Sequence, residues 1–141
     1  MEIIGIDFDG TCVTHEFPEV GKDIGAVSVL KRIVEKGHKL ILFTMRSDRK
    51  DVKTTSDQIH PHGGDYLTRA IRWFKENDIK LYGVNENPDQ RSWTDSPKPY
   101  CTIYIDDSGL GCPLEFDQKF SKRPYVNWVR VEQMLKEMGV I

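Results

Sequence analysis

Two aspartates stand two residues apart at the end of the first apolar stretch of the chain, in the segment IIGIDFDGTC. The β-branched residues before them predict a buried strand over residues 3–6. Residues i and i+2 of a strand point to the same side, so Asp7 and Asp9 are expected to converge while Phe8 faces away. Carboxylates beside an apolar core are costly unless a cation or hydrogen bonds compensate them. The pair therefore predicts a site that binds a cation and does chemistry.

Other polar residues follow other apolar stretches in the same way. Asp106 and Asp107 end the stretch YCTIYI, and Thr44 ends the stretch HKLILF. In an open parallel sheet, ligands bind beyond the carboxyl ends of the strands, so these residues are expected at one edge together with the first acidic pair. Four clustered carboxylates repel one another, and a hard divalent cation with oxygen ligands, usually Mg²⁺, relieves that repulsion. Lys98, shortly before the last of these stretches, supplies a further positive charge.

The elements that must position these residues alternate along the chain. Strands are expected over residues 3–6, 38–43, 80–84 and 100–105, and helices over residues 26–34, 66–77 and 126–138. This alternation predicts a single α/β domain over residues 1–141, a Rossmann-like three-layer α/β/α fold with helices on both faces of a parallel sheet. Two long polar segments, 47–64 and 85–99, fit no regular element, and the first is either a functional loop or disordered.

Composition excludes several functional classes. The chain has 141 residues, a formal net charge of −2, 38% hydrophobic residues and 30% charged residues, which is typical of a soluble globular protein. The charge does not indicate a nucleic-acid partner, and no apolar run is long enough to predict a membrane span. Its three cysteines have no CxxC spacing, and we interpret them as reduced thiols of a cytoplasmic protein.

The order of these motifs resembles that of the haloacid dehalogenase superfamily of phosphotransferases and hydrolases. DFDGT at 7–11 matches the first motif of the superfamily, LILFT at 40–44 the second, and IYIDD at 103–107 the fourth. Lys98 in SPKPY matches the third motif, which is the least specific of the four. The resemblance implies a haloacid dehalogenase-like fold and a Mg²⁺-dependent phosphatase that acts on a phosphorylated substrate.

The resemblance also implies a role for each matched residue. Asp7 would be the nucleophile that forms an aspartyl phosphate, and Asp9 would be the general acid and base. Thr44 would hydrogen-bond a phosphoryl oxygen, and Lys98 would neutralise charge on the nucleophile and the phosphoryl group. Mg²⁺ would be held by the carboxylate of Asp7, the backbone carbonyl of Asp9 and an acid of the last motif.

Neighbours in an extended strand point oppositely, so only one acid of the last motif is expected to face the metal. Alignment with the motif of the superfamily favours Asp107 as the direct ligand, with Asp106 behind it or holding the lysine. The substrate-binding candidates are Gly10 and Thr11, where the chain turns, and Arg46. Arg46 follows Thr44 by two residues, and it either grips a substrate phosphate or forms a surface salt bridge.

The substrate class stays open between several alternatives. Aspartate at position 9 favours phosphoryl transfer over carbon–halogen cleavage in this superfamily, and the spacing of the motifs leaves no room for a sizeable cap domain. An open site suits a polynucleotide end or a phosphoprotein, whereas a partner subunit in a homo-oligomer or the 47–64 loop would cover a small molecule. A regulatory binding module without catalysis is the alternative from another class.

Histidine and tryptophan give weaker signals. His60 and His62 stand at a spacing that suggests zinc, but without cysteines at ligand spacing we interpret them as part of a polar loop. Trp73 lies beside the apolar stripe of the second helix and is expected in the core. Trp93 lies in a loop and is the best candidate for stacking on a base.

Overall fold

The computed structural model describes residues 1–49 and 64–141, and over these ranges it contains one parallel sheet and three α-helices. The elements in chain order are β1 (Ile3–Ile6), α1 (Ala26–Glu35), β2 (Lys39–Leu42), β3 (Asp48–Arg49), β4 (Gly64–Asp65), α2 (Tyr66–Glu76), β5 (Gly83–Val84), the 3₁₀ turn η1 (Gln90–Ser92), β6 (Ile103–Ile105), β7 (Leu114–Glu115), β8 (Tyr125–Val126) and α3 (Trp128–Glu137). The predicted helices and the predicted strands of the sheet are confirmed, although the third and fourth strands are shorter than predicted.

The central sheet has the strand order β5-β2-β1-β6, and all of its neighbouring strands are parallel. Its register places Ile6 of β1 between Leu42 of β2 and Ile105 of β6. The first strand of the chain is therefore central in the sheet, and the residue that follows it emerges between the ends of two neighbouring strands.

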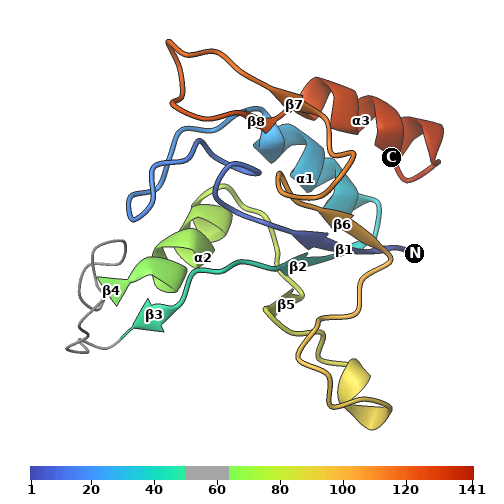
Figure 1. Cartoon of the computed structure of the whole chain (residues 1–141). Helices are drawn as coiled ribbons and strands as arrows, with labels where there is room; N and C mark the ends of the chain where they lie inside the picture. Colours follow the sequence, from blue (N-terminus) through green and yellow to red (C-terminus); the bar gives the residue numbers. More distant parts are fainter. Residues whose placement is uncertain (50–63) are drawn as a thin grey trace.

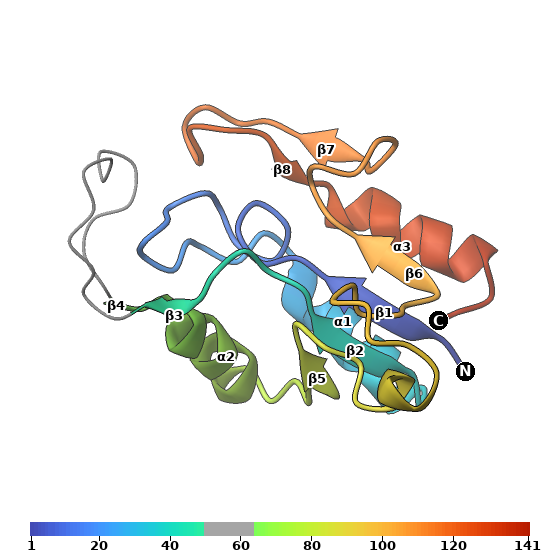
Figure 2. The same cartoon turned by 60° about the horizontal axis from the view of Figure 1, so that its bottom comes forward.

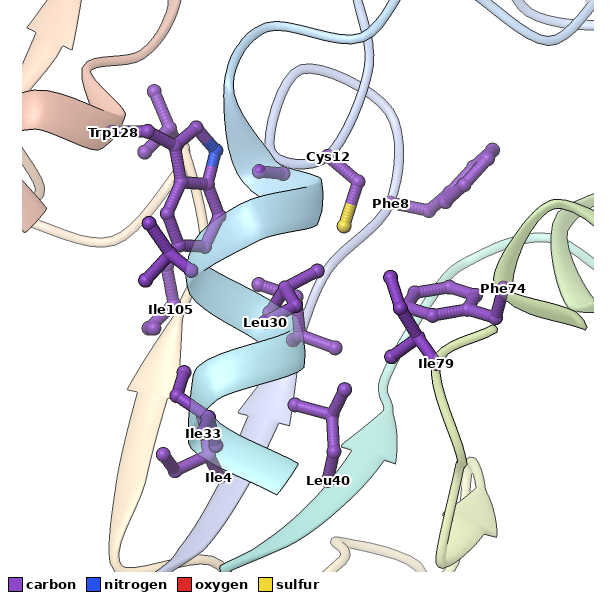
Figure 3. Close-up of a cluster of buried hydrophobic side chains, with 14 of the residues drawn as sticks. Ile4, Phe8, Cys12, Leu30, Ile33, Leu40, Phe74, Ile79, Ile105 and Trp128 are labelled. Carbon is purple, nitrogen blue, oxygen red and sulfur yellow. The ribbon is translucent and has the colours of Figure 1, made fainter. Parts of the chain in front are cut away.

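All three α-helices of the described residues pack on one face of this sheet. Their buried side chains form a single apolar cluster with Ile4, Ile6, Leu40 and Leu42. Alternate residues of a strand face opposite sides, and the register aligns these four positions, so they belong to the same face. Figure 3 shows Leu30 and Ile33 of α1 lying over these strands, with Phe8 and Phe74 at one side of the cluster and Trp128 at the other.

The predicted second layer of helices is therefore wrong for the described residues. The opposite face of the sheet is covered by the irregular segment 85–102, whose helical structure is limited to the short turn η1. Figure 1 shows α1 and α3 above the sheet and this segment below it, and in Figure 2 the segment lies in front of the sheet with α1 behind. The segment contains Pro88, Pro97 and Pro99, and a proline inside a helix removes a backbone hydrogen bond and clashes with the preceding turn.

Two small antiparallel pairs, β3–β4 and β7–β8, were not predicted. Each strand in them has two residues, which is too short for an alternation to be recognised in the sequence. The β3–β4 pair flanks residues 50–63, so most of the predicted 47–64 loop, including His60 and His62, lies outside the described residues.

Two expectations from composition can be compared with the structure. No helix in the described ranges is long and apolar enough to cross a membrane. Cys12 and Cys101 are buried, Cys112 is partly buried, and all three are free thiols, as predicted from their spacing.

Trp128 connects α3 to the turn that follows β1. The side chain of Asn127 caps the helix by accepting a hydrogen bond from the backbone N–H of Arg130 at 3.0 Å. At the next position, the indole Nε1 of Trp128 donates to the backbone carbonyl of Thr11 at 2.7 Å, and both residues are buried. The helix thereby fixes the backbone immediately below the predicted site.

We expect Trp128→Phe to lower the free energy of unfolding by about 1–3 kcal/mol, because the buried carbonyl of Thr11 loses its donor. Urea denaturation of the purified variant measures this change. The control is Val129→Ala on the same helix, where the side chain is 79% exposed and the effect should stay within about 0.5 kcal/mol. Equal stability of Trp128→Phe and the control would show that the hydrogen bond does not anchor the turn.

Candidate active site

The carboxyl ends of β1 and β6 bring three acidic side chains together. Asp7 directly follows β1, and Asp106 and Asp107 directly follow β6, the strand paired with β1. One carboxylate oxygen from each lies within 4.8 Å of the other two. The predicted convergence of strand ends is therefore confirmed for these three residues.

Both acids of the last motif take part in this cluster, although only one of them was expected to face the metal. That expectation assumed an extended chain, but β6 ends at Ile105 and the chain then turns. The backbone N–H of Gly109 donates to the carbonyl of Asp106 at 2.9 Å, and the N–H of Ser108 donates to the Asp106 carboxylate at 2.8 Å. The turn redirects Asp107 toward the same side as its neighbour.

Asp9 does not join the three-carboxylate cluster. Its two carboxylate oxygens accept hydrogen bonds from Nε and Nη2 of Arg46, each at 2.8 Å. The alternation that was expected to align Asp9 with Asp7 ends with β1, because the N–H groups of Thr11 and Cys12 both bond to the carbonyl of Phe8 and turn the chain. The carboxylate of Asp9 is therefore aimed at the arginine in this conformation.

Arg46 is a buried structural cation, and its side chain is only 1% exposed. Besides Asp9, its guanidinium donates to the backbone carbonyls of Pro18, Glu19 and Tyr66 at 2.8–3.2 Å. These contacts engage all five N–H donors that a guanidinium possesses. Arg46 therefore forms neither of the two predicted contacts here, since it has no donor left for a phosphate and does not lie at the surface.

Thr11 and Gly10 lie beneath the acidic cluster. The hydroxyl of Thr11 is within hydrogen-bond distance of the carboxylates of Asp7 at 2.9 Å and Asp107 at 3.3 Å, and it accepts the N–H of Asp107 at 3.0 Å. Gly10 has a φ of +80°, and a side chain there would collide with His15 and Asp107. Both residues are buried, so the structure places these two substrate-binding candidates where they orient the acids.

His15 is part of the site, although it was not recognised in the sequence. Its Nε2 lies 2.9 Å from Oδ2 of Asp107, and the two side chains are 13% and 10% exposed. The histidine belongs to the irregular loop between β1 and α1, which folds back over Gly10. Its position four residues after the DFDGT motif was the available signal, but no periodicity predicts where such a loop returns.

The remaining two predicted residues lie after β2 and in the 85–102 segment, and of the two only Lys98 lines the cavity that contains Asp7. Thr44 donates its backbone N–H to the side chain of Asn85 at 2.8 Å, and its hydroxyl accepts the N–H of Arg46 at 3.1 Å. Lys98 is exposed and lines a cavity of about 280 Å³ together with Asp7 and Asp106. The cavity therefore unites an acid from each of two strand ends with the predicted lysine.

Burial and mutual repulsion raise the affinity of the acids for protons. The pKa of Asp7 is raised to about 8, first by burial and then by the charge of Asp106 and a hydrogen bond to Asp107. The pKa of Asp106 is also raised, mainly by burial. Three carboxylates supply the hard oxygen ligands that Mg²⁺ prefers, so the donor set fits such a cation.

The raised pKa of Asp7 predicts a pH-dependent effect of Asp7→Asn on stability. The folded state binds this proton more tightly than the unfolded chain, where the ordinary pKa is 3.8, so the stabilisation is complete below about pH 4 and is lost as the pH rises to about 8. Asparagine does not titrate. In the presence of a chelator, we expect the free energy of unfolding of the variant to rise, relative to that of the wild type, by about 1 kcal/mol or more between pH 4 and pH 8.

Urea denaturation at pH 4 and pH 8 measures the difference in the free energy of unfolding between the variant and the wild type. Glu137→Gln, at an exposed position, is the control for removing one negative charge. A gap between Asp7→Asn and the wild type that is the same at both pH values would contradict the raised pKa.

Comparison with known proteins adds one structural relative and no named family. No protein-family model matches the chain, and no curated protein matches it. A solved structure of a conserved protein from Bacteroides thetaiotaomicron is similar over 97% of this chain and 91% of its own, with a TM-score of 0.69 and 27% sequence identity. The chain is thus similar over nearly its whole length to a bacterial protein that is described only as conserved.

Proposed function

We propose that the chain is a Mg²⁺-dependent phosphomonoester hydrolase of the haloacid dehalogenase type, with Asp7 as the nucleophile. The observation that carries the proposal is the cavity in which Asp7, Asp106 and Lys98 face the same space. A phosphoryl group entering it meets a carboxylate nucleophile and an ammonium group together. The order of the sequence motifs gives independent support.

The reaction would proceed in two displacements. An oxygen of Asp7 attacks phosphorus, the bond from phosphorus to the ester oxygen breaks, and the leaving oxygen takes a proton from Asp9. A water then attacks the aspartyl phosphate and gives a proton to Asp9, which releases inorganic phosphate and restores both residues. Lys98 and the hydroxyl of Thr44 would stabilise the negative charge of the phosphoryl oxygens.

The acids of the cluster would hold the metal, together with the backbone carbonyl of Asp9. When bound, Mg²⁺ neutralises charge between the anionic nucleophile and the anionic substrate. Thr11, whose hydroxyl lies within hydrogen-bond distance of both Asp7 and Asp107, and His15, which contacts the other oxygen of Asp107, would preserve the orientation of Asp107. Asp106 lines the cavity itself, so both acids of the last motif are candidates for direct ligation.

The ion pair of Asp9 with Arg46 sets a condition on this mechanism. Both carboxylate oxygens of Asp9 accept a hydrogen bond from the guanidinium in this conformation. Donation of a proton by Asp9 therefore requires that at least one of the two contacts with Arg46 open when substrate binds. The same observation favours the second candidate function, a phosphate-binding module in which Asp9 is purely structural.

The metal and the nucleophile are tested together by hydrolysis of an aryl phosphate. We expect turnover to require Mg²⁺ and to stop on chelation, and Asp7→Asn to abolish it, because an amide is a poor nucleophile of nearly the same shape. Glu137→Gln, which alters an exposed ion pair on α3, should keep full turnover.

Full activity after rigorous chelation would refute the metal, and turnover by Asp7→Asn free of wild-type enzyme would refute the covalent mechanism. Binding of phosphate without any turnover by the wild type would leave the binding module as the function.

The proton-transfer role of Asp9 is tested by leaving groups of different basicity. Asp9→Asn should slow hydrolysis of an alkyl phosphate far more than that of an aryl phosphate with a good leaving group, because only the former needs protonation. General acid–base catalysis is typically worth about 10² to 10⁴ in rate, which sets the expected difference. Rates are normalised to the folded fraction, since the change also removes a partner of the buried Arg46.

Intact-mass measurement after mixing with substrate should reveal phosphorylated Asp9→Asn protein, because breakdown of the intermediate also slows. Equal slowing of both substrates, with no phosphorylated protein, would assign Asp9 a structural role only.

A further inference from the structure

Two aromatic rings form a wall of the cavity that contains Asp7. Phe43 follows β2 and Tyr104 lies in β6, and both line the cavity together with Asp7 and Lys98. Their ring centroids are 6.1 Å apart, with 54° between the ring planes. Tyr104 is on the face of the sheet that carries no described α-helix, so its ring is not covered by a helix and the residue is 40% exposed.

The ring of Tyr104 is held in a fixed position. Its hydroxyl donates to the carbonyl of Pro99 at 2.7 Å and accepts the N–H of Cys101 at 3.2 Å. Tyr104 pairs with Gly5 of the neighbouring strand, and a side chain at Gly5 would come within 3.1 Å of the ring. Glycine at this position therefore lets the ring lie close to β1.

This ring lies close to the proposed nucleophile along the strand. Asp7 follows Gly5 by two residues, which corresponds to about 7 Å along β1 and keeps both on the same side. The ammonium group of Lys98 lies over the Tyr104 ring, 5.2 Å from its centroid, so a ligand that packs on this face displaces the lysine toward its phosphate. The charged groups at one end of the cavity are thus about 5–7 Å from the rings. This is about the distance between the phosphate of a phosphomonoester and an aromatic ring in its leaving group.

We propose that the cavity selects phosphomonoesters whose leaving group carries a planar aromatic ring, which packs against Tyr104 and Phe43 while the phosphate meets Asp7. This inference rests on the proposed function and names its substrate class. The wall formed by Phe43 and Tyr104 presents aromatic rings to the cavity. The hydroxyl of Tyr104 already has two hydrogen-bond partners, Pro99 and Cys101. A sugar placed there would lose hydration of its hydroxyl groups without gaining partners from this wall.

A matched pair of substrates separates the ring from the phosphate. Adenosine 5′-monophosphate and ribose 5-phosphate share the phosphorylated ribose and differ in the base, and phosphotyrosine carries an aryl ring directly on the ester oxygen. We expect kcat/KM to be about 5- to 100-fold higher for the nucleotide than for the sugar phosphate, the range that corresponds to stacking of one base. A preference for phosphotyrosine over the nucleotide would indicate that the preferred substrate is an aryl phosphate, in which the ring is bonded directly to the ester oxygen.

Variants of the wall test which residues produce this preference. Tyr104→Leu should reduce the nucleotide-to-sugar ratio of kcat/KM to near one, whereas Tyr104→Phe, which keeps the ring, should retain most of it. Trp93→Leu is the control, because Trp93 is another aromatic residue of the 85–102 segment, is 64% exposed and does not line the cavity. A wild-type ratio of one or below, or an unchanged ratio in Tyr104→Leu, would overturn the inference.

Binding to the Asp7→Asn variant separates failure of this inference from failure of the proposed function. Calorimetric titration in Mg²⁺ should show tighter binding of adenosine 5′-monophosphate than of ribose 5-phosphate. If the wild type hydrolyses neither compound but the variant prefers the nucleotide, the phosphatase proposal fails and the aromatic subsite stands. Equal binding of the two compounds would refute the subsite even if both were hydrolysed.

Discussion

Mutual repulsion among Asp7, Asp106 and Asp107 is the constraint around which the rest of the site is arranged. Like charges within 4.8 Å in a partly buried place are unfavourable, and burial first and the charge of Asp106 second raise the pKa of Asp7. The hydroxyl of Thr11 and the imidazole of His15 hold the carboxylates in place, and Trp128 of α3 holds the backbone of Thr11. The turn after β1, the loop before α1 and the last helix are therefore all involved in keeping three acids together.

The uneven covering of the sheet gives this cluster its access to ligands. The described α-helices all bury the face that carries Ile4 and Ile6, and they leave the face of Gly5 and Tyr104 to the proline-containing segment 85–102. A helix packed there would cover the ring of Tyr104 and close the space beside Asp7. The irregular segment instead brings Lys98 to the edge of the cavity and fixes the tyrosine hydroxyl through Pro99. The departure from a three-layer fold and the presence of a cavity thus have the same origin.

The sequence predicted those features that depend on local periodicity. Apolar alternation located the strands and helices, and the rule that ligands bind at the carboxyl ends of parallel strands brought Asp7, Asp106 and Asp107 to one place. Prediction from the sequence failed where the chain leaves regular secondary structure. The alternation that aligned Asp9 with Asp7 stops at the turn after Phe8, and the contacts of His15 depend on a loop that has no repeating pattern. That no α-helix of residues 1–49 and 64–141 covers the second face was foreseeable only from the prolines of the 85–102 segment.

Arg46 shows why the long-range contacts could not be predicted, and what they imply for the chemistry. Its partners are the side chain of Asp9 and three backbone carbonyls from the loop before α1 and from the start of α2, and a sequence does not indicate which carbonyls a cation will find. Removing one partner of a buried ion pair is strongly destabilising, so this guanidinium ties the loop and the helix to Asp9. If Asp9 transfers protons, loosening that pair also loosens the loop and the helix start. Proton transfer at Asp9 and the position of the loop that carries His15 are then coupled through a single arginine.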